Sequence, residues 1–415
     1  MMTNKPIFLL VVDDDPVFSL FIRQMVLSLG GELPCRVSSV ESAETALSEI
    51  QRTRFDVVLL DYHLPGMSGL DLIGHLRVLP LEQQPAIVML TGSGNESVAV
   101  EAMKRGAKDY LQKNEVDVPS LMRAIQSALA QKRLAEQIAS YNAIMNADLA
   151  MARKLQDSLL PRSYPNFPRS AAPDDSALRF DHRYFWTAQL GGDFFSVQDL
   201  SDTRAGVLVC DVMGHGVRAA MVTAMLRAMV GDLDAHANDP GRFLSAMNHK
   251  LAVILKQIDE PLFATAFYLV ADVAEGRARY AKAGHPPPLH VQRAAGKVAP
   301  LQLPHAAGAA LGLFEKNEYV TGECSLAAGD LILLFTDGLF EIANADDEDY
   351  GQARLRAAVR GRMRQPLPEL LDGVIADVRE FSAGAEFDDD VCLLGMEVAG
   401  TGGRGYNTFE TKVAP

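Results

Sequence analysis

The chain has 415 residues, 48% of them hydrophobic and 22% charged, which is typical of globular proteins and long enough for two or more domains. Its net charge of −14 argues against a general nucleic-acid or anionic-membrane binder, because either needs a basic face. Four widely separated cysteines without a CxxC pair argue against a zinc site or disulfides, and no apolar run suits a signal peptide or membrane span, so we expect a cytoplasmic protein.

Strand-like and helical segments alternate in the first third of the chain. Short apolar runs at 7–12, 56–61 and 86–91 predict strands that are buried on both faces. Between them, residues 41–51 and 97–107 have the apolar spacing of helices. This alternation predicts a parallel sheet covered by helices on both sides.

A long helix is predicted next, because residues 120–160 contain neither glycine nor proline. Its apolar residues recur every three or four positions, which predicts a dimeric coiled coil, with a single amphipathic helix lying on its own domain as the alternative. Prolines at 161, 165 and 168 end the helix. The apolar seam consists of Leu134, Ile138, Tyr141, Met145, Leu149 and Ala152.

The remainder of the chain is rich in strands. Helical stretches are expected around 217–231, 240–256 and 353–380. Several strand-like runs follow one another without an intervening helix, which predicts an antiparallel α+β domain. The glycine-rich residues 401–415 are expected to form a flexible tail. The strand-like runs lie at 205–212, 264–272, 277–284, 330–338 and 390–398.

Polar residues lie at the carboxyl ends of the predicted parallel strands, where doubly wound sheets carry their functional groups. Asp13 and Asp14 follow the first strand and Asp61 ends another, so these acids could hold a hard cation through oxygen ligands. A hydroxyl from Thr91 and an ammonium from Lys113 could bind phosphoryl oxygens beside it. Asp61 would then be a nucleophile that forms an aspartyl phosphate.

The motifs "VVDDDP", "LLDYHLPGMSG", "MLTG" and "GAKDYLQK" resemble those of response-regulator receiver domains in order and spacing. The resemblance implies a doubly wound, flavodoxin/CheY-like α/β domain over residues 1–125, phosphorylated by a sensor histidine kinase or phosphotransfer protein. Asn114 departs from the family, which usually has a proline after a cis peptide at this position. The implied roles are Mg²⁺ binding by Asp13, Asp14, Asp61 and the carbonyl of His63, phosphorylation of Asp61, phosphoryl recognition by Thr91 and Lys113, and an aromatic switch at Tyr110.

A second set of acids lies in the strand-rich part, at Asp193, Asp211, Asp337 and Asp389. Three of them adjoin apolar strand sequence, where a carboxylate is costly unless it is hydrogen-bonded or bound to a metal. Taken singly, each acid is more typical of a turn or a helix cap. Together, without cysteines or regularly spaced histidines, they favour Mg²⁺ or Mn²⁺. Two such ions bridged by one acid could activate water for attack on a phosphate ester.

The motifs "GGDFF", "CDVMGHGVRAAM", "AGHPPPL", "LLFTDGLFE" and "DDDVCLL" resemble the SpoIIE/RsbU-type group of PPM metal-dependent Ser/Thr protein phosphatases. The resemblance implies an antiparallel β-sandwich flanked by helices over residues 166–400. A coiled-coil linker over 126–165 would join it to the receiver and form a homodimer. The implied ligands of two Mn²⁺ or Mg²⁺ ions are Asp193, Asp211 as the bridge, the carbonyl of Val212, Asp337 and Asp389.

Two residues depart from the phosphatase pattern, and others near the motifs are given no role. Ser196 stands where the group usually has a second acid, and Cys392 where it usually has threonine. Neither change removes an implied ligand. His215 and His285 are interpreted as loop histidines with satisfied hydrogen bonds rather than as general acids, and Trp186 and Met213 as packing or rim residues.

These features predict a response regulator whose phosphorylation controls a protein phosphatase. The resemblance implies that its substrate is a phosphoserine or phosphothreonine on an anti-sigma-factor antagonist of the STAS type, in a partner-switching pathway. The alternative is a non-catalytic adaptor that uses a phosphatase-like domain to bind a sigma factor or an anti-sigma partner. Such adaptors have lost their acids, whereas the acid set here is complete, so we favour the enzyme. A transcription-factor output lacks support, because no basic recognition helix is present.

Overall fold

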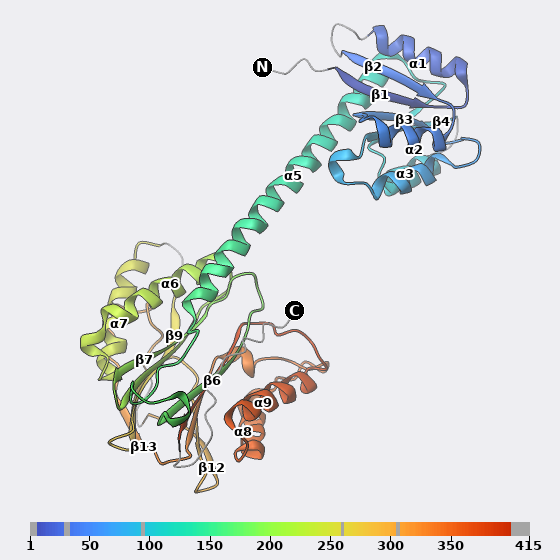
Figure 1. Ribbon diagram of the computed structural model, residues 1–415. Helices are drawn as coiled ribbons and strands as arrows, with labels where there is room; N and C mark the ends of the chain where they lie inside the picture. Colours follow the sequence, from blue (N-terminus) through green and yellow to red (C-terminus); the bar gives the residue numbers. More distant parts are fainter. Residues whose placement is uncertain (1–5, 29–33, 93–95, 259–260, 304–307, 400–415) are drawn as a thin grey trace. The chain divides into compact units, whose positions relative to one another are not determined.

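The computed structural model describes residues 6–28, 34–92, 96–258, 261–303 and 308–399 (Figure 1). The chain divides into two compact units, residues 1–146 and 147–415. The tail predicted for residues 401–415 lies outside the described residues.

The first unit is built on a five-stranded parallel sheet with the order β2-β1-β3-β4-β5. Strands β3 and β4 are buried along their whole length, which explains their continuous apolar sequence. Helix α1 and the start of α5 pack on one face, and α2, α3 and α4 pack on the other. The predicted doubly wound α/β fold is confirmed. The strands are β1 (Ile7–Val12), β2 (Cys35–Val40), β3 (Val57–Asp61), β4 (Ala86–Thr91) and β5 (Asp109–Gln112), and the helices are α1 (Pro16–Ser28), α2 (Ala43–Arg52), α3 (Gly69–Arg77) and α4 (Glu96–Arg105).

Helix α5 (Val118–Leu159) runs without a break for 42 residues and ends before Pro161, as the sequence predicts. Its first turns enter the core of the first unit through residues such as Leu121 and Ile125. Four of the six predicted seam residues are more than half exposed within this chain, namely Leu134, Ile138, Tyr141 and Met145. No helix in the described ranges is both long and apolar enough to cross a membrane.

The second unit contains two five-stranded sheets, β13-β10-β9-β8-β7 and β12-β11-β14-β15-β6. All strand pairs within them are antiparallel. The first sheet comprises β7 (Asp193–Ser201), β8 (Arg204–Val212), β9 (Ala264–Asp272), β10 (Arg277–Ala283) and β13 (Gly322–Ser325). The second comprises β6 (Leu178–Phe185), β11 (Leu289–Gln292), β12 (Lys297–Pro300), β14 (Leu331–Phe335) and β15 (Val391–Val398).

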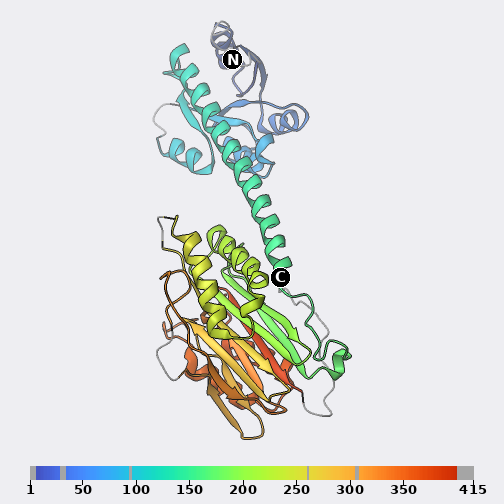
Figure 2. The same ribbon diagram turned by 90° about the vertical axis from the view of Figure 1, so that its left-hand side faces the viewer.

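Three apolar layers hold this unit together. Side chains of both sheets, such as Phe195 and Leu394, meet in a central core. Helices α6 (Val217–Asp232) and α7 (Pro240–Leu255) cover the outer face of the first sheet (Figure 2). Phe194 of β7 packs against these helices. Helices α8 (Gly351–Arg362) and α9 (Leu367–Phe381) cover the second sheet. The predicted antiparallel sandwich flanked by helices is confirmed, and the helical stretch predicted around 353–380 consists of two helices separated before Pro366.

Candidate functional site

The acids of the first unit meet at the carboxyl edge of its parallel sheet. Asp13 follows β1 and Asp61 ends β3, and ligand atoms of Asp13, Asp14 and Asp61 all lie within 4.8 Å of one another. Asp13 and Asp61 are buried, whereas Asp14 is exposed. The Nζ atom of Lys113, just beyond β5, lies 2.7 Å from Asp13 Oδ2 and 2.9 Å from Asp61 Oδ2. The donor set fits a hard divalent cation beside a fixed ammonium group.

The electrostatics of this cluster favour a bound cation. Burial raises the pKa of Asp61, although its hydrogen bond to Lys113 acts in the opposite direction. Burial alone would lower the pKa of Lys113, but its bonds to Asp13 and Asp61 outweigh that effect and raise it. Three carboxylates against one ammonium leave excess negative charge, which a divalent ion would neutralise.

The other predicted residues of the first unit lie on β4, on β5 and in the loop after β3. Thr91 is buried at the end of β4, and its carbonyl accepts a hydrogen bond of 2.8 Å from the backbone N–H of Lys113. His63 lies two residues after Asp61 in the loop that leaves β3. The side chain of Tyr110 on β5 is 42% exposed.

The departure at Asn114 does not require a strained peptide. Among the peptide bonds of the described residues, the only cis bond joins Phe167 and Pro168, so the bond between Lys113 and Asn114 is trans. Lys113 reaches the two buried acids from this trans backbone.

The acids of the second unit come from both sheets. Asp193 and Asp211 are direct cross-strand partners on β7 and β8 of the first sheet. Asp337 begins the short 3₁₀ helix after β14, and Asp389 lies two residues before β15, on the second sheet. The backbone at Gly338 approaches this segment so closely that a Cβ there would lie 3.0 Å from the carbonyl oxygen of Asp389.

The acids of the second unit perturb one another. Burial, followed by repulsion from Asp337 and Asp389, raises the pKa of Asp211 to about 7. Burial and the neighbouring Asp211 raise the pKa of Asp193 well above its usual range. This concentration of mutually repelling carboxylates fits divalent cations. Among the described residues, these acids do not form a group of three ligand atoms within 4.8 Å of one another, as the acids of the first unit do.

The main chain between these acids is closely packed. The carbonyl of Gly192 accepts a hydrogen bond of 3.2 Å from the backbone N–H of Val212, and a Cβ at Gly192 would lie 2.5 Å from the carbonyl oxygen of Val212. Only glycine at 192 therefore permits the segment before Asp193 to lie beside the end of β8. The carbonyl of Val212 remains a predicted ligand.

Thr336 is a site residue that the sequence interpretation missed. It is fully buried, and its Oγ1 donates to Asp193 Oδ2 at 2.6 Å while accepting from the backbone N–H of Cys392 at 2.9 Å. The hydroxyl therefore fixes the orientation of the Asp193 carboxylate. The sequence does contain a signal for this residue, because Thr336 is a polar residue that lies between an apolar strand and the predicted ligand Asp337.

Replacing Thr336 by valine should weaken Mn²⁺ binding to the second unit by about 10- to 100-fold, because the group that orients Asp193 is lost. Calorimetric titration measures this in a chain that carries Asp14→Asn, so that the receiver acids contribute little. Thr336→Ser keeps the hydroxyl and should bind Mn²⁺ like the parent. Parental affinity in the valine variant would show that the hydrogen bond is unimportant.

Asp390 is a second residue that was missed. It is buried, and it accepts hydrogen bonds from the backbone N–H groups of Thr187 at 2.9 Å and Gly192 at 2.8 Å. Asp389, by contrast, is exposed. Because both carboxylate oxygens of Asp390 hold the segment before Asp193, Asp389 is the acid of this pair that suits a metal. The sequence alone does not separate two adjacent identical residues.

The two histidines differ in their surroundings. His215 is exposed after β8. His285 is buried, its Nδ1 lies 2.7 Å from Thr265 Oγ1, and burial lowers its pKa to about 3. Thr265 is the cross-strand partner of Asp211, so His285 lies near the acids but remains neutral at physiological pH.

The other named positions pack around the site. The Trp186 ring is tilted by 45° against that of Tyr184, with ring centroids 4.4 Å apart, and Met213 is 40% exposed. Ser196 is buried on β7 and Cys392 on β15.

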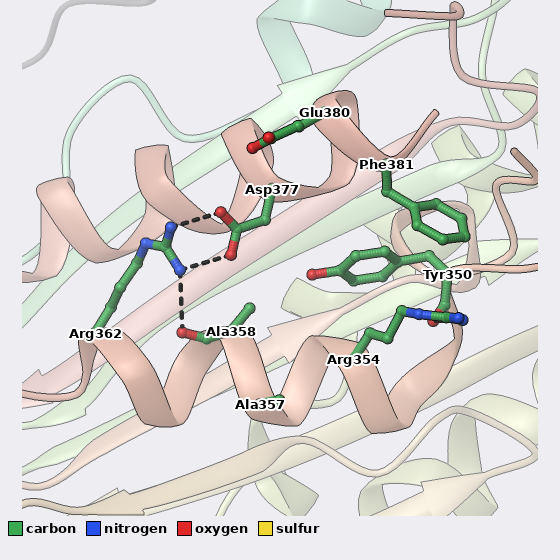
Figure 3. A pocket seen from close by; sticks show the side chains of 8 residues that line it. All are labelled: Tyr350, Arg354, Ala357, Ala358, Arg362, Asp377, Glu380 and Phe381. Carbon is green, nitrogen blue, oxygen red and sulfur yellow. Dashed lines mark hydrogen bonds and ion pairs between the residues drawn. The ribbon is translucent and has the colours of Figure 1, made fainter. Parts of the chain in front are cut away.

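A hollow of about 510 Å³ between α8 and α9 lies outside both acid clusters (Figure 3). The Arg354 guanidinium lies over the ring of Phe381 at 4.8 Å, and Arg362 pairs with both carboxylate oxygens of Asp377. None of the candidate acids lines this hollow. Its cations already have partners, so we interpret it as a packing gap between two helices.

The shifted acid makes metal binding depend on pH. Because the folded pKa of Asp211 is about 7, above its unfolded value, the metal-free fold loses stability as the pH rises from about 4 to about 7. Mn²⁺ must displace this proton, so its affinity should rise roughly tenfold per pH unit below about pH 7. The measurement is a calorimetric titration of Mn²⁺ into the chain that carries Asp14→Asn. Repeating it in buffers of different ionisation enthalpy gives the number of protons that are released when Mn²⁺ binds. A flat affinity across this range would contradict the assignment.

Two family models match the chain. Residues 9–126 match the response regulator receiver domain, and residues 201–399 match stage II sporulation protein E (SpoIIE). Phosphoserine phosphatase RsbP of Bacillus subtilis is 24% identical over 252 residues, covering 60% of this chain and 58% of RsbP. Phosphoserine phosphatase RsbU of the same organism is 26% identical over 198 residues, covering 48% of this chain and 54% of RsbU.

The chain therefore spans somewhat more than half the length of these two relatives. Among solved structures, the SiaA-PP2C domain of Pseudomonas aeruginosa superposes with a TM-score of 0.53 at 22% identity, covering 62% of this chain and 99% of that domain. This likeness shows that the two share a fold. The first unit thus matches the response regulator receiver domain, and most of the second unit matches the SpoIIE family.

Proposed function

We propose that this chain is a response regulator in which phosphorylation of Asp61 controls a metal-dependent serine/threonine protein phosphatase. The observation that carries the proposal is the complete set of four acids, Asp193, Asp211, Asp337 and Asp389, at the meeting ends of two sheets. A scaffold that had lost catalysis would have no need for carboxylates that repel one another there.

The first unit would receive the signal from a sensor histidine kinase or a phosphotransfer protein. In this role, Asp61 accepts the phosphoryl group, and Lys113 and Thr91 bind its oxygens. Tyr110 on β5 serves as the switch residue. The proposed ligands of Mg²⁺ are Asp13, Asp14, Asp61 and the carbonyl of His63.

The second unit would hold two Mn²⁺ or Mg²⁺ ions. The proposed ligands are Asp193, Asp211 as the shared acid, the carbonyl of Val212, Asp337 and Asp389. When bound, such ions activate a water and neutralise the charge of a phosphate ester. Thr336 holds Asp193 in one orientation.

The main chain after Asp211 makes a turn that requires glycine at two positions. Gly214 and Gly216 have φ values of 81° and 85°, and no atom lies within 4 Å of where a Cβ would be at either position. The backbone conformation, rather than crowding, therefore requires glycine here.

The proposed substrate is a phosphorylated STAS-type anti-sigma-factor antagonist in a cytoplasmic partner-switching pathway. RsbP and RsbU, which this chain resembles, are named phosphoserine phosphatases. We further propose a homodimer through the exposed seam of α5, whose residues Leu134, Ile138, Tyr141 and Met145 lack an intramolecular cover. Sedimentation of the full chain measures this oligomeric state.

A phosphate-release assay tests the proposal. The full chain with Mn²⁺ should release phosphate from a phosphoserine-bearing STAS protein, and chelation should stop the release. Running the assay with and without a small-molecule phosphodonor determines whether phosphorylation of Asp61 activates or inhibits. Binding of the phosphoprotein without any turnover would replace the enzyme by the adaptor.

A further inference from the structure

The end of helix α5 is bonded to the segment that leads into Asp193. Gln156 is buried, and its Nε2 donates to the carbonyl oxygen of Gly191 at 2.7 Å. The backbone N–H of Gly191 donates back to Gln156 Oε1 at 3.1 Å. The amide side chain of Gln156 thus bonds both the N–H and the carbonyl group of the buried Gly191. A neighbouring β-strand would satisfy the same two groups.

Arg153, one turn earlier on the same helix, holds the preceding part of this segment. Its Nη1 donates to the carbonyl oxygens of Ala188 at 3.1 Å and Gln189 at 3.3 Å. Its guanidinium lies 3.9 Å from the centroid of the Trp186 ring. Two residues of α5 therefore bind the segment from Trp186 to Gly191 at both ends.

This segment has little freedom to move independently of the acids. A Cβ at Gly191 would lie 2.1 Å from Asp390 Oδ2 and 2.5 Å from the Trp186 ring. The next residue, Gly192, donates to Asp390, and Asp193 follows directly. Displacing the end of α5 would leave the buried N–H and carbonyl groups of Gly191 without partners, which is unfavourable. The segment therefore follows the helix.

We propose that Gln156 and Arg153 are positioning residues through which helix α5 sets the geometry of the Asp193 metal ligand. The inference rests on the proposed function and names the contact by which the receiver regulates the second unit. Helix α5 is continuous from the receiver core at Leu121 to these two residues, so a change in its position reaches Gly191 without passing through a loop. Neither residue touches the substrate or the reacting atoms.

The chain carries its own reporter for this contact. Trp186 is the single tryptophan of the sequence, and it lies under Arg153 and against Gly191. Its fluorescence therefore reports on the α5 contact and not on the receiver. We expect a small-molecule phosphodonor to change Trp186 emission in the full-length protein.

Gln156→Met keeps the size of the side chain and removes both hydrogen bonds. We expect this variant to be phosphorylated on the receiver like the parent, but to lose most of the emission change and to bind Mn²⁺ about tenfold more weakly. Gln156→Glu can still accept from Gly191 and should be intermediate. Lys154→Met, at an exposed position on the same helix, should behave like the parent.

Several outcomes overturn the proposal. One is a parental emission change and Mn²⁺ affinity in Gln156→Met, and another is the absence of any emission change in the parent. If Gln156→Met does not fold, as judged by its melting temperature, Arg153→Met removes the contact with Trp186 from a less buried position, and the same criteria apply. Trp186 emission and Mn²⁺ binding can both be measured without hydrolysis. If the emission and binding results agree with the proposal but the chain releases no phosphate, the proposed function is wrong and the role of Gln156 and Arg153 stands.

Discussion

Replacing Asp211 by asparagine is expected to reduce phosphoserine hydrolysis by more than about 100-fold. Outer partners of metal ligands alone are worth about 10- to 100-fold, and Asp211 is the acid proposed to contact both ions. Asparagine has the same shape, so the pairing of β8 with β7 should be retained. The measurement is phosphate release at saturating Mn²⁺.

The same substitution should stabilise the metal-free protein. Because the pKa of Asp211 is raised to about 7, its ionisation at pH 8 costs stability, and asparagine avoids that cost. The melting temperature of metal-free Asp211→Asn at pH 8 should therefore exceed that of the parent. Asp346→Asn, at an exposed turn acid of the same unit, should change neither quantity. Lost activity together with a lower melting temperature would indicate misfolding instead.

Replacing Asp61 by asparagine is expected to abolish labelling of the chain by a small-molecule phosphodonor. An amide cannot attack phosphorus as a carboxylate does, and Asp61 is the acid held at 2.9 Å by Lys113 at the carboxyl edge of the sheet. The labelled parent should require Mg²⁺, because Asp13, Asp14 and Asp61 would bind it. Phosphate-affinity electrophoresis of the parent and the variant measures the modification.

The control is Asp109→Asn, which changes an acid at the amino end of β5, the opposite edge of the same sheet. This variant should be labelled like the parent. Labelling of Asp61→Asn at the parental level would place the phosphoacceptor elsewhere.

The buried elements could be predicted from sequence because their burial leaves continuous apolar runs. Strands β1, β4 and β9 coincide with the runs identified at 7–12, 86–91 and 264–272. Strand β2, by contrast, lies at a sheet edge and has no fully buried residue, so it has no such run. Short strands such as β12 are equally weak signals.

The residues that hold the site in place could not be predicted in the same way. Thr336 bonds to Asp193 across 143 positions of the chain, and Gln156 bonds to Gly191 across 35. Such contacts depend on the folded arrangement and produce no local pattern. The acids of the second unit could be singled out because they lie beside apolar strand sequence, where a carboxylate is costly, and because they occupy motifs that resemble those of a known family.

The four acids of the second unit are divided between the strands of its two sheets, since Asp193 and Asp211 lie on β7 and β8, whereas Asp337 and Asp389 adjoin β14 and β15. Ions bound by acids from both pairs would link the two sheets of the sandwich at one edge. These acids would then hold the two sheets together at the edge to which α5 is bonded through Gly191. An input that loosens this edge would weaken ion binding, and ion binding would in turn resist that input.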